Sequence, residues 1–202
     1  MYNIRWIIFR AGETISRVGG VEMNFYEAVF CGGQEFLYMA KLTRQEARET
    51  LFGLLFETEF QGGKEPAAIY DLACEDRDIP NDKYVRESFF GILAKASVLD
   101  AVISRYAKGW RADRLSRVSR TVIRIAVYEM LFVDDIPMNV SISQAVSLTL
   151  KFGEDKAKQF VNGVLSGVFK DIEANGAEAV IAEAVNGMQT ACAEEADGTE
   201  NA

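Results

Sequence analysis

Apolar residues recur at helical spacing through most of the chain, and this repeat is the strongest constraint on its fold. Between about residues 41 and 173 they return every three or four positions, which gathers them on one face of each helix. The sequence shows no strong alternation of the kind typical of strands. It therefore predicts an all-α fold of six or seven helices, in two packed helical bundles that meet near residue 80 or 110.

Capping and helix-breaking residues divide this region. Thr43 and Glu46 form a capping box ahead of the first helix, and Ser141 with Gln144 predicts a second one. Later breaks fall at glycine pairs and at Asp-Ile-Pro sequences. The expected helices begin near residue 41 and continue at about 66–74, 82–108, 116–133, 141–153 and 155–173.

The two ends of the chain differ from its middle. Residues 1–38 have no sustained period and form an atypical N-terminal extension. Met39 lies just before the first helix, and Gln34-Glu35 can be encoded CAGGAG, a ribosome-binding sequence. We therefore expect a mis-assigned start, with a genuine extension as the alternative. Residues 174–202 form an acidic tail, with a short helix at 177–188 and a disordered end.

The amino-acid composition disfavours metal-binding, cofactor-binding and membrane-spanning proteins. The chain has no histidine and only three widely separated cysteines, Cys31, Cys74 and Cys192, so neither metal nor cofactor is expected. No apolar run approaches the roughly 20 residues of a membrane-spanning helix. These features favour a cytoplasmic protein without a membrane segment.

Charge is distributed unevenly along the chain. The formal charge is −8, but residues 171–202 contain eight acids and no Lys or Arg. Residues 39–170 carry 19 basic and 18 acidic residues, and seven of the basic ones fall between Arg105 and Arg124. A dense basic block on an acidic protein favours binding to a polyanion.

Three basic clusters are candidates for that binding. Lys41, Arg44 and Arg48 share one helical face, with ion pairs to neighbouring glutamates as the alternative. The second cluster contains Arg117 and Arg120 together with Arg111, Arg114 and Arg124, and its alternative is pairing with acids at 75–82.

The third cluster opens the last core helix with Lys156, Lys158, Phe160 and Asn162. A helix start offers free N–H groups to phosphate, and an exposed Phe can stack on an RNA base. The alternative places Phe160 in the hydrophobic core.

The order of several short motifs resembles the NusB family of transcription antitermination factors. The motifs are Ala47-Arg48-Glu49, Trp110 with Arg114-Leu115, Arg120 to Glu129, Asp135-Ile136-Pro137, Ala145-Val146, Lys151-Phe152-Gly153 and Phe160 to Leu165. The resemblance covers about residues 41–172. It departs from the family pattern at Ser119 and at Ser141–Gln144, where the family usually has acids.

The resemblance implies a non-enzymatic protein that binds a boxA-type single-stranded RNA together with NusE, a ribosomal small-subunit protein. Its larger complex would contain NusA, NusG and RNA polymerase and would suppress premature termination, chiefly in ribosomal RNA operons. Residues 39–173 would be the RNA-binding helical domain. Some relatives are dimers, so a homodimer is also considered.

The sequence also bears on two other classes of protein. A similar helical domain forms part of some ribosomal RNA cytosine methyltransferases, but the sequence has no GxGxxG and no suitably placed catalytic cysteine. The remaining alternative is a helical protein–protein adaptor without RNA specificity.

Overall fold

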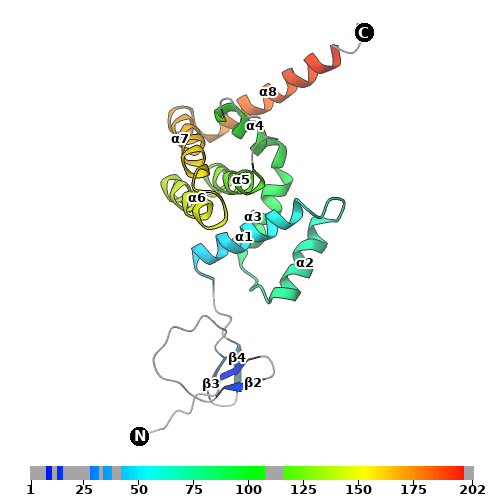
Figure 1. Cartoon of the computed structure of the whole chain (residues 1–202), viewed down its shortest axis with the longest axis vertical. Helices are drawn as coiled ribbons and strands as arrows, with labels where there is room; N and C mark the ends of the chain where they lie inside the picture. The colour runs from blue at the N-terminus through cyan, green and yellow to red at the C-terminus, as the bar shows by residue number, and fades with distance from the viewer. Residues whose placement is uncertain are drawn as a thin grey trace.

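Eight helices follow four short strands in the part of the chain that the structure describes (Figure 1). This computed structural model describes residues 8–10, 13–15, 28–31, 34–37, 42–107 and 116–197. Two antiparallel hairpins come first, formed by β1 (Ile8–Arg10) with β2 (Glu13–Ile15) and by β3 (Ala28–Cys31) with β4 (Gln34–Leu37). The helices are α1 (Arg44–Thr58), α2 (Pro66–Arg77), α3 (Lys83–Ala94), α4 (Ala96–Tyr106), α5 (Arg117–Phe132), α6 (Met138–Phe152), α7 (Ala157–Asn175) and α8 (Ala177–Asp197).

The region from α1 onward is all-helical, as the periodicity predicts, although the helix count is higher than six or seven. The hairpins were not predicted, because strands of three or four residues are too short to show a sustained alternation. At the other end, α8 continues to Asp197, well past the short helix expected at 177–188.

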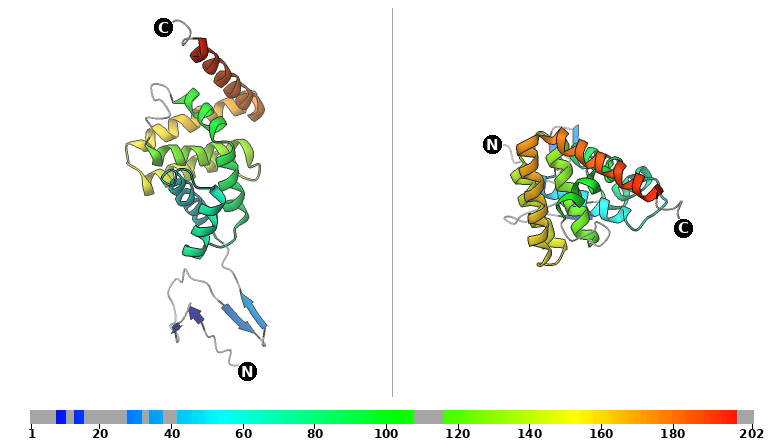
Figure 2. Two further views of the ribbon diagram at one scale, coloured as in Figure 1. Left: turned by 90° about the vertical axis from the view of Figure 1, so that its right-hand side faces the viewer. Right: turned by 90° about the horizontal axis from the view of Figure 1, so that it is seen from above.

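Helix α5 lies at the centre of the helical body (Figure 1). It packs against α1 and α3 on one side and against α4, α6 and α7 on the other, while α8 packs on α4 and α7 and projects beyond them (Figure 2). One continuous hydrophobic core receives side chains from all eight helices. Burial of this core supplies the main driving force for folding.

The predicted single helix at 82–108 is wrong, because the chain bends at Lys95 between α3 and α4. The Lys95 amide still donates to the Gly91 carbonyl at 3.1 Å, and the Leu99 amide donates to the Lys95 carbonyl at 2.9 Å. The Lys95 dihedrals (φ −110°, ψ 13°) leave the helical range, and no proline or glycine at that position marks the bend. The expected meeting of two helical bundles near residue 80 or 110 stays a prediction.

Gly91, one turn before this bend, is required by close packing. A Cβ atom at Gly91 would overlap the hydroxyl end of the Tyr128 ring on α5. The absence of a side chain therefore lets α3 approach α5 directly.

Only one of the two predicted capping boxes is present. Thr43 accepts from the Glu46 amide, and the Glu46 carboxylate accepts from the Thr43 amide at 2.8 Å. Helix α6 instead begins at Met138, directly after Pro137. The predicted cap at Ser141 is wrong, because the Ser141 side chain is buried and donates to Glu129.

Glu129 is the centre of a buried polar network that joins four helices. Its carboxylate is 1% exposed and accepts from Arg48 Nε of α1 at 2.7 Å and from Ser141 Oγ of α6 at 2.6 Å. It also accepts from the Tyr84 hydroxyl of α3. Because these donors come from three different helices, the carboxylate fixes how α1, α3 and α6 pack around α5.

Replacing Arg48 with Ala should destabilise the fold strongly. The substitution leaves the Glu129 carboxylate buried without its cation, a change that typically costs about 3–5 kcal/mol. Urea unfolding at neutral pH measures this loss. The double variant Arg48→Met, Glu129→Leu should recover much of it, and equal stability of Arg48→Ala and the parent chain would contradict the network's role.

Candidate nucleic-acid interface

The first basic cluster divides into one buried and one exposed arginine. Arg48 is 4% exposed and paired with Glu129, so the prediction that it contacts RNA is wrong. Arg44, one turn earlier, is exposed at the start of α1. Lys41 lies outside the described residues. Within α1, Arg44 is exposed at the helix start, whereas Arg48, one turn later, faces the core.

Arg44 lies against an aromatic ring of α3. Its Cζ atom is 5.3 Å from the centroid of the Tyr84 ring, and the Arg48 Cζ is 5.9 Å from the same centroid. Burial and the neighbouring Glu129 carboxylate raise the pKa of Tyr84, so its phenol stays neutral and donates. Arg44 also borders a groove of about 810 Å³ between the starts of α1 and α3 and the end of α5.

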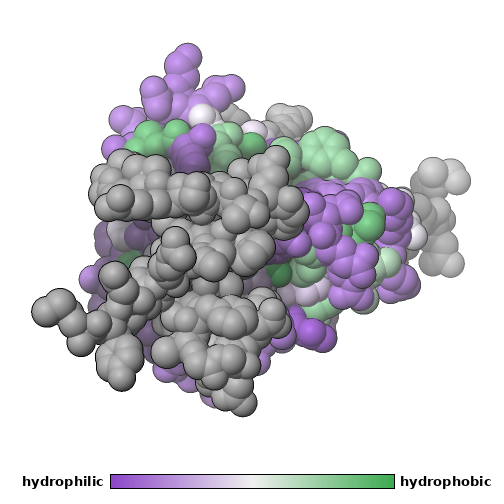
Figure 3. Space-filling model, turned by 90° about the horizontal axis from the view of Figure 1, so that it is seen from below, coloured by the Kyte–Doolittle hydropathy of each residue, from purple (hydrophilic) through white to green (hydrophobic). Residues whose placement is uncertain are grey.

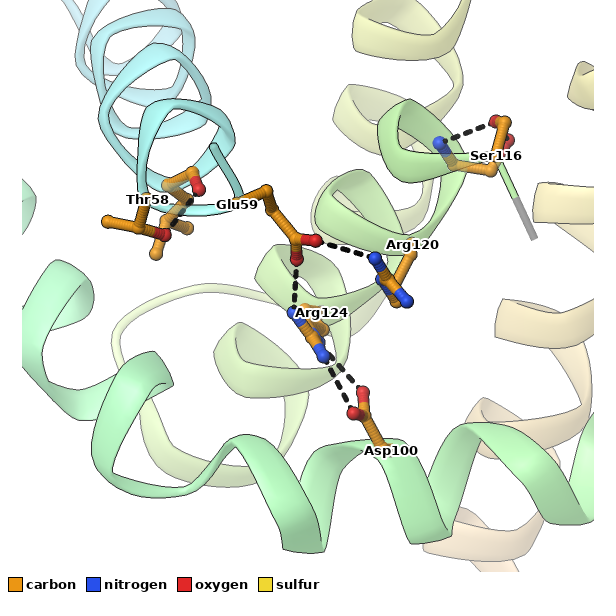
Figure 4. Close-up of polar contacts among 8 residues, drawn as sticks. Thr58, Glu59, Asp100, Ser116, Arg120 and Arg124 are labelled. Atoms are coloured by element: carbon orange, nitrogen blue, oxygen red, sulfur yellow. Dashed lines mark hydrogen bonds and ion pairs between the residues drawn. The ribbon is translucent and has the colours of Figure 1, made fainter. Parts of the chain in front are cut away.

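The second cluster is largely used inside the protein (Figure 4). Glu59, which caps α1, pairs with Arg120 at 2.5 Å and with Arg124 at 2.9 Å, and Arg124 also forms two hydrogen bonds with Asp100 of α4. Burial alone would lower the pKa of Arg124, but Asp100 and Glu59 raise it. The predicted contact of Arg120 with RNA would compete with its ion pair to Glu59 and stays a prediction. The pairing alternative holds, with acids from α1 and α4 instead of residues 75–82.

Arg117 is the exposed member of this cluster. Its Cζ lies 4.5 Å from the centroid of the Phe60 ring, and Phe60 itself is 60% exposed. Arg111 and Arg114 lie outside the described residues. Of the second cluster, the described structure leaves Arg117 as the cation best placed to meet a ligand.

The third cluster lies at the start of α7. Lys156, Lys158 and Asn162 are exposed, whereas Phe160 is half-buried and packs against the hydrophobic core. Lys156 is the N-cap residue and makes no side-chain cap, while the Ala157 and Lys158 amides donate to the Glu154 and Asp155 carbonyls at 2.8 and 3.3 Å. This turn therefore offers its cations to an anion, whereas two of its backbone donors are already used.

An aromatic strip is formed by the half-buried Phe56 and the exposed Phe60 and Phe152. Phe56 and Phe60 follow Phe52 at intervals of four along α1, and the Phe152 ring of α6 stacks on Phe52 at 4.5 Å. Lys151 Nζ lies 5.5 Å from the centroid of Phe152. Of these rings, Phe152 belongs to the family motif Lys151-Phe152-Gly153. A phenylalanine repeat that continues past the end of α1 is the sequence signal that could have located Phe56 and Phe60.

One face of the molecule is seen in a view from below. Seen from below, the coloured atoms form a largely hydrophilic face with small hydrophobic patches (Figure 3). On the opposite side of the body, Arg105 pairs with Glu183 of α8 and donates to the Val180 carbonyl. Glu183 of α8 therefore lies against α4.

Two further observations limit the chemistry of the described region. None of its helices is long and apolar enough to cross a membrane. Within the same residues, His, Cys, Asp and Glu side chains form no group of three or more that could hold a metal ion.

An all-helical body with exposed cations at three helix starts and a neighbouring aromatic strip is typical of the class of proteins that bind nucleic acid. The profile of the NusB family matches residues 44–170, so this chain belongs to the NusB family.

Several relatives and solved structures resemble the chain. A transcription antitermination protein NusB of Bacillus licheniformis is 36% identical over 132 residues, which cover 65% of this chain and 100% of the relative. That of Agathobacter rectalis is 40% identical over 128 residues, covering 62% and 98%. The NusB structure of T. maritima matches with a TM-score of 0.59 at 34% identity, over 65% of this chain and 93% of that one. A structure of antitermination factors NusB and NusE in complex with dsRNA matches with a TM-score of 0.56 at 28% identity, over 63% and 96%.

Replacing Phe160 with Leu separates its two predicted roles. Leucine fills similar space in the core, so the free energy of unfolding should change by less than about 1.5 kcal/mol. If the ring also stacks on a base, RNA affinity should fall by roughly 1–3 kcal/mol. Urea unfolding and RNA titration measure the two effects. Lost stability with unchanged affinity would assign Phe160 to the core alone.

Proposed function

We propose that this chain is a transcription antitermination factor that binds boxA-type single-stranded RNA together with NusE. It would help RNA polymerase read through terminators, chiefly in ribosomal RNA operons. The observation that carries the proposal is family membership over nearly the whole length of the curated relatives, which are named as antitermination proteins. The related NusB–NusE–RNA complex supports both partners. The role is non-enzymatic.

The proposed RNA surface combines the exposed Arg44, Arg117, Lys156, Lys158 and Asn162 with the half-buried Phe160. Lys41, which lies outside the described residues, is assigned to the same surface from its position in the sequence. Cations in this set would contact phosphates, which supply most of the affinity, while Phe160 and Asn162 would contact bases. The buried ion pairs of Arg48 and Arg120 support the fold that presents them.

NusE is proposed to dock on the aromatic strip. Phe60 and Phe152 are exposed large rings, 60% and 39%, and protein interfaces are enriched in aromatic side chains and arginine. Arg117 and Lys151 border the strip through their contacts with these two rings. Burial of such rings against a partner would give the interface a central apolar anchor.

Other parts of the proposal concern the wider assembly. NusA, NusG and RNA polymerase would complete the complex, in the cytoplasm. Residues 39–173 would form the RNA-binding domain, with 1–38 and 174–202 outside it. A homodimer would compete with RNA binding if it covered the same surface.

Two cation substitutions test the RNA surface. The double variant Arg44→Gln, Lys158→Gln removes two proposed phosphate contacts, so the slope of log affinity against log salt should become shallower by about 1.4 for a single strand. Titration of a labelled boxA RNA and a scrambled RNA at several salt concentrations, with and without NusE, provides the measurement. An unchanged slope would remove these residues from the surface.

The same titrations distinguish the main proposal from its alternative. Preference for boxA over the scrambled RNA that increases with NusE supports the antitermination role. Retained NusE binding without RNA binding would instead identify a helical protein adaptor.

A substitution on the aromatic strip tests NusE docking. Phe60→Ser removes a ring that is mostly exposed, so the free energy of unfolding should change little while NusE affinity falls about tenfold, as for an interface anchor. Calorimetric titration with NusE measures the affinity. Leu72→Ser on α2 is the matched control, because Leu72 is also exposed, at 49%, and lies outside the strip. Equal effects of both substitutions would contradict docking on the strip.

A further inference from the structure

The Tyr84 ring touches both arginines of the first cluster, although only one of them is buried. The ring is almost completely buried, and its hydroxyl donates to Glu129, so its position is fixed from behind by the polar network. The exposed Arg44 guanidinium faces this ring at 5.3 Å. A cation at this distance from an aromatic face is attracted by the ring's quadrupole.

The backbone of Arg44 is held by the same network. Arg48 Nη1 donates to the Arg44 carbonyl at 3.4 Å, while Arg48 Nε and Nη2 donate to Glu129. Both the main chain and the side chain of Arg44 are thus tied to groups that Glu129 orients. A long side chain restrained before binding loses less conformational entropy when a ligand arrives.

We propose that Tyr84 is a positioning residue for RNA binding, which holds the Arg44 guanidinium toward the ligand. The buried network of Glu129, Arg48 and Tyr84 then has two roles, since it fixes the helices and presets one exposed cation at the start of α1. This inference rests on the proposed RNA-binding function. Tyr84 itself would not contact RNA.

Two substitutions of Tyr84 separate its ring from its hydroxyl. Tyr84→Leu and Tyr84→Phe both remove the hydrogen bond to Glu129, but only Tyr84→Phe keeps an aromatic face beneath Arg44. Each variant is first checked by circular dichroism and urea unfolding, and binding is measured where it is fully folded. Tyr84→Leu should weaken binding of a labelled single-stranded boxA RNA about two- to fivefold, and Tyr84→Phe should restore most of that affinity.

A double-variant cycle shows whether Tyr84 acts through Arg44. In the Arg44→Gln background, Tyr84→Leu should cause no further loss of RNA affinity, because the cation it positions is gone. Arg86→Gln on α3 is the control for charge, since Arg86 is exposed and lies outside the proposed surface. An equal loss from Tyr84→Leu in both backgrounds, or no loss in either, would overturn the inference.

A structural readout supplements affinity and separates this inference from the proposed function. Nuclear magnetic resonance of the Arg44 side chain should show ring-current shifts that persist in Tyr84→Phe and disappear in Tyr84→Leu. If Lys158→Gln weakens RNA binding but Arg44→Gln does not, the positioning role is wrong while RNA binding stands. If neither variant weakens RNA binding, the proposed RNA surface itself fails.

Discussion

The buried carboxylate of Glu129 is the interaction on which the helical packing depends. Removing a charge from water is costly, and only a cation and several hydrogen bonds in good geometry offset that cost. Arg48, Tyr84 and Ser141 supply them from three helices that are distant in sequence. Apolar contacts tolerate small shifts of a helix along its axis, whereas these donors satisfy the carboxylate in one arrangement only. The network therefore selects one packing of α1, α3 and α6 around α5.

A second set of ion pairs joins α4, α5 and the end of α1. Glu59 at the end of α1 meets Arg120 and Arg124 of α5, and Asp100 of α4 completes the set. Mutual repulsion among arginines at this density would destabilise α5 if the acids were absent. Much of the basic block is thus neutralised within the fold, and the number of cations in the sequence overstates the charge that a polyanion meets.

The sequence predicts the helices well but the roles of individual polar residues poorly. Periodicity and breakers locate α1, α2, α5 and α7 because these signals are local. The bend at Lys95 has no local signal in the sequence. The Ser141–Gln144 pattern resembles a capping box, although the Ser141 hydroxyl donates to Glu129. Whether an arginine is free or paired depends on acids far away in sequence, such as Glu129 for Arg48, 81 residues later. A single sequence contains no measure of that distance in space.

Arg44 and Arg48 illustrate how burial decides the role of a charge. They lie one turn apart, share a helical face and lie near the same Tyr84 ring. Arg48 points toward the core, where an unpaired guanidinium would have a high free-energy cost. It therefore pairs with Glu129. Arg44 remains in solvent, where its cation is screened and available to a ligand. Because the ring beneath it is fixed by the same carboxylate, fold stability and presentation of this cation are coupled through Glu129. Sequence changes that weaken the network should therefore alter ligand binding before the fold is lost.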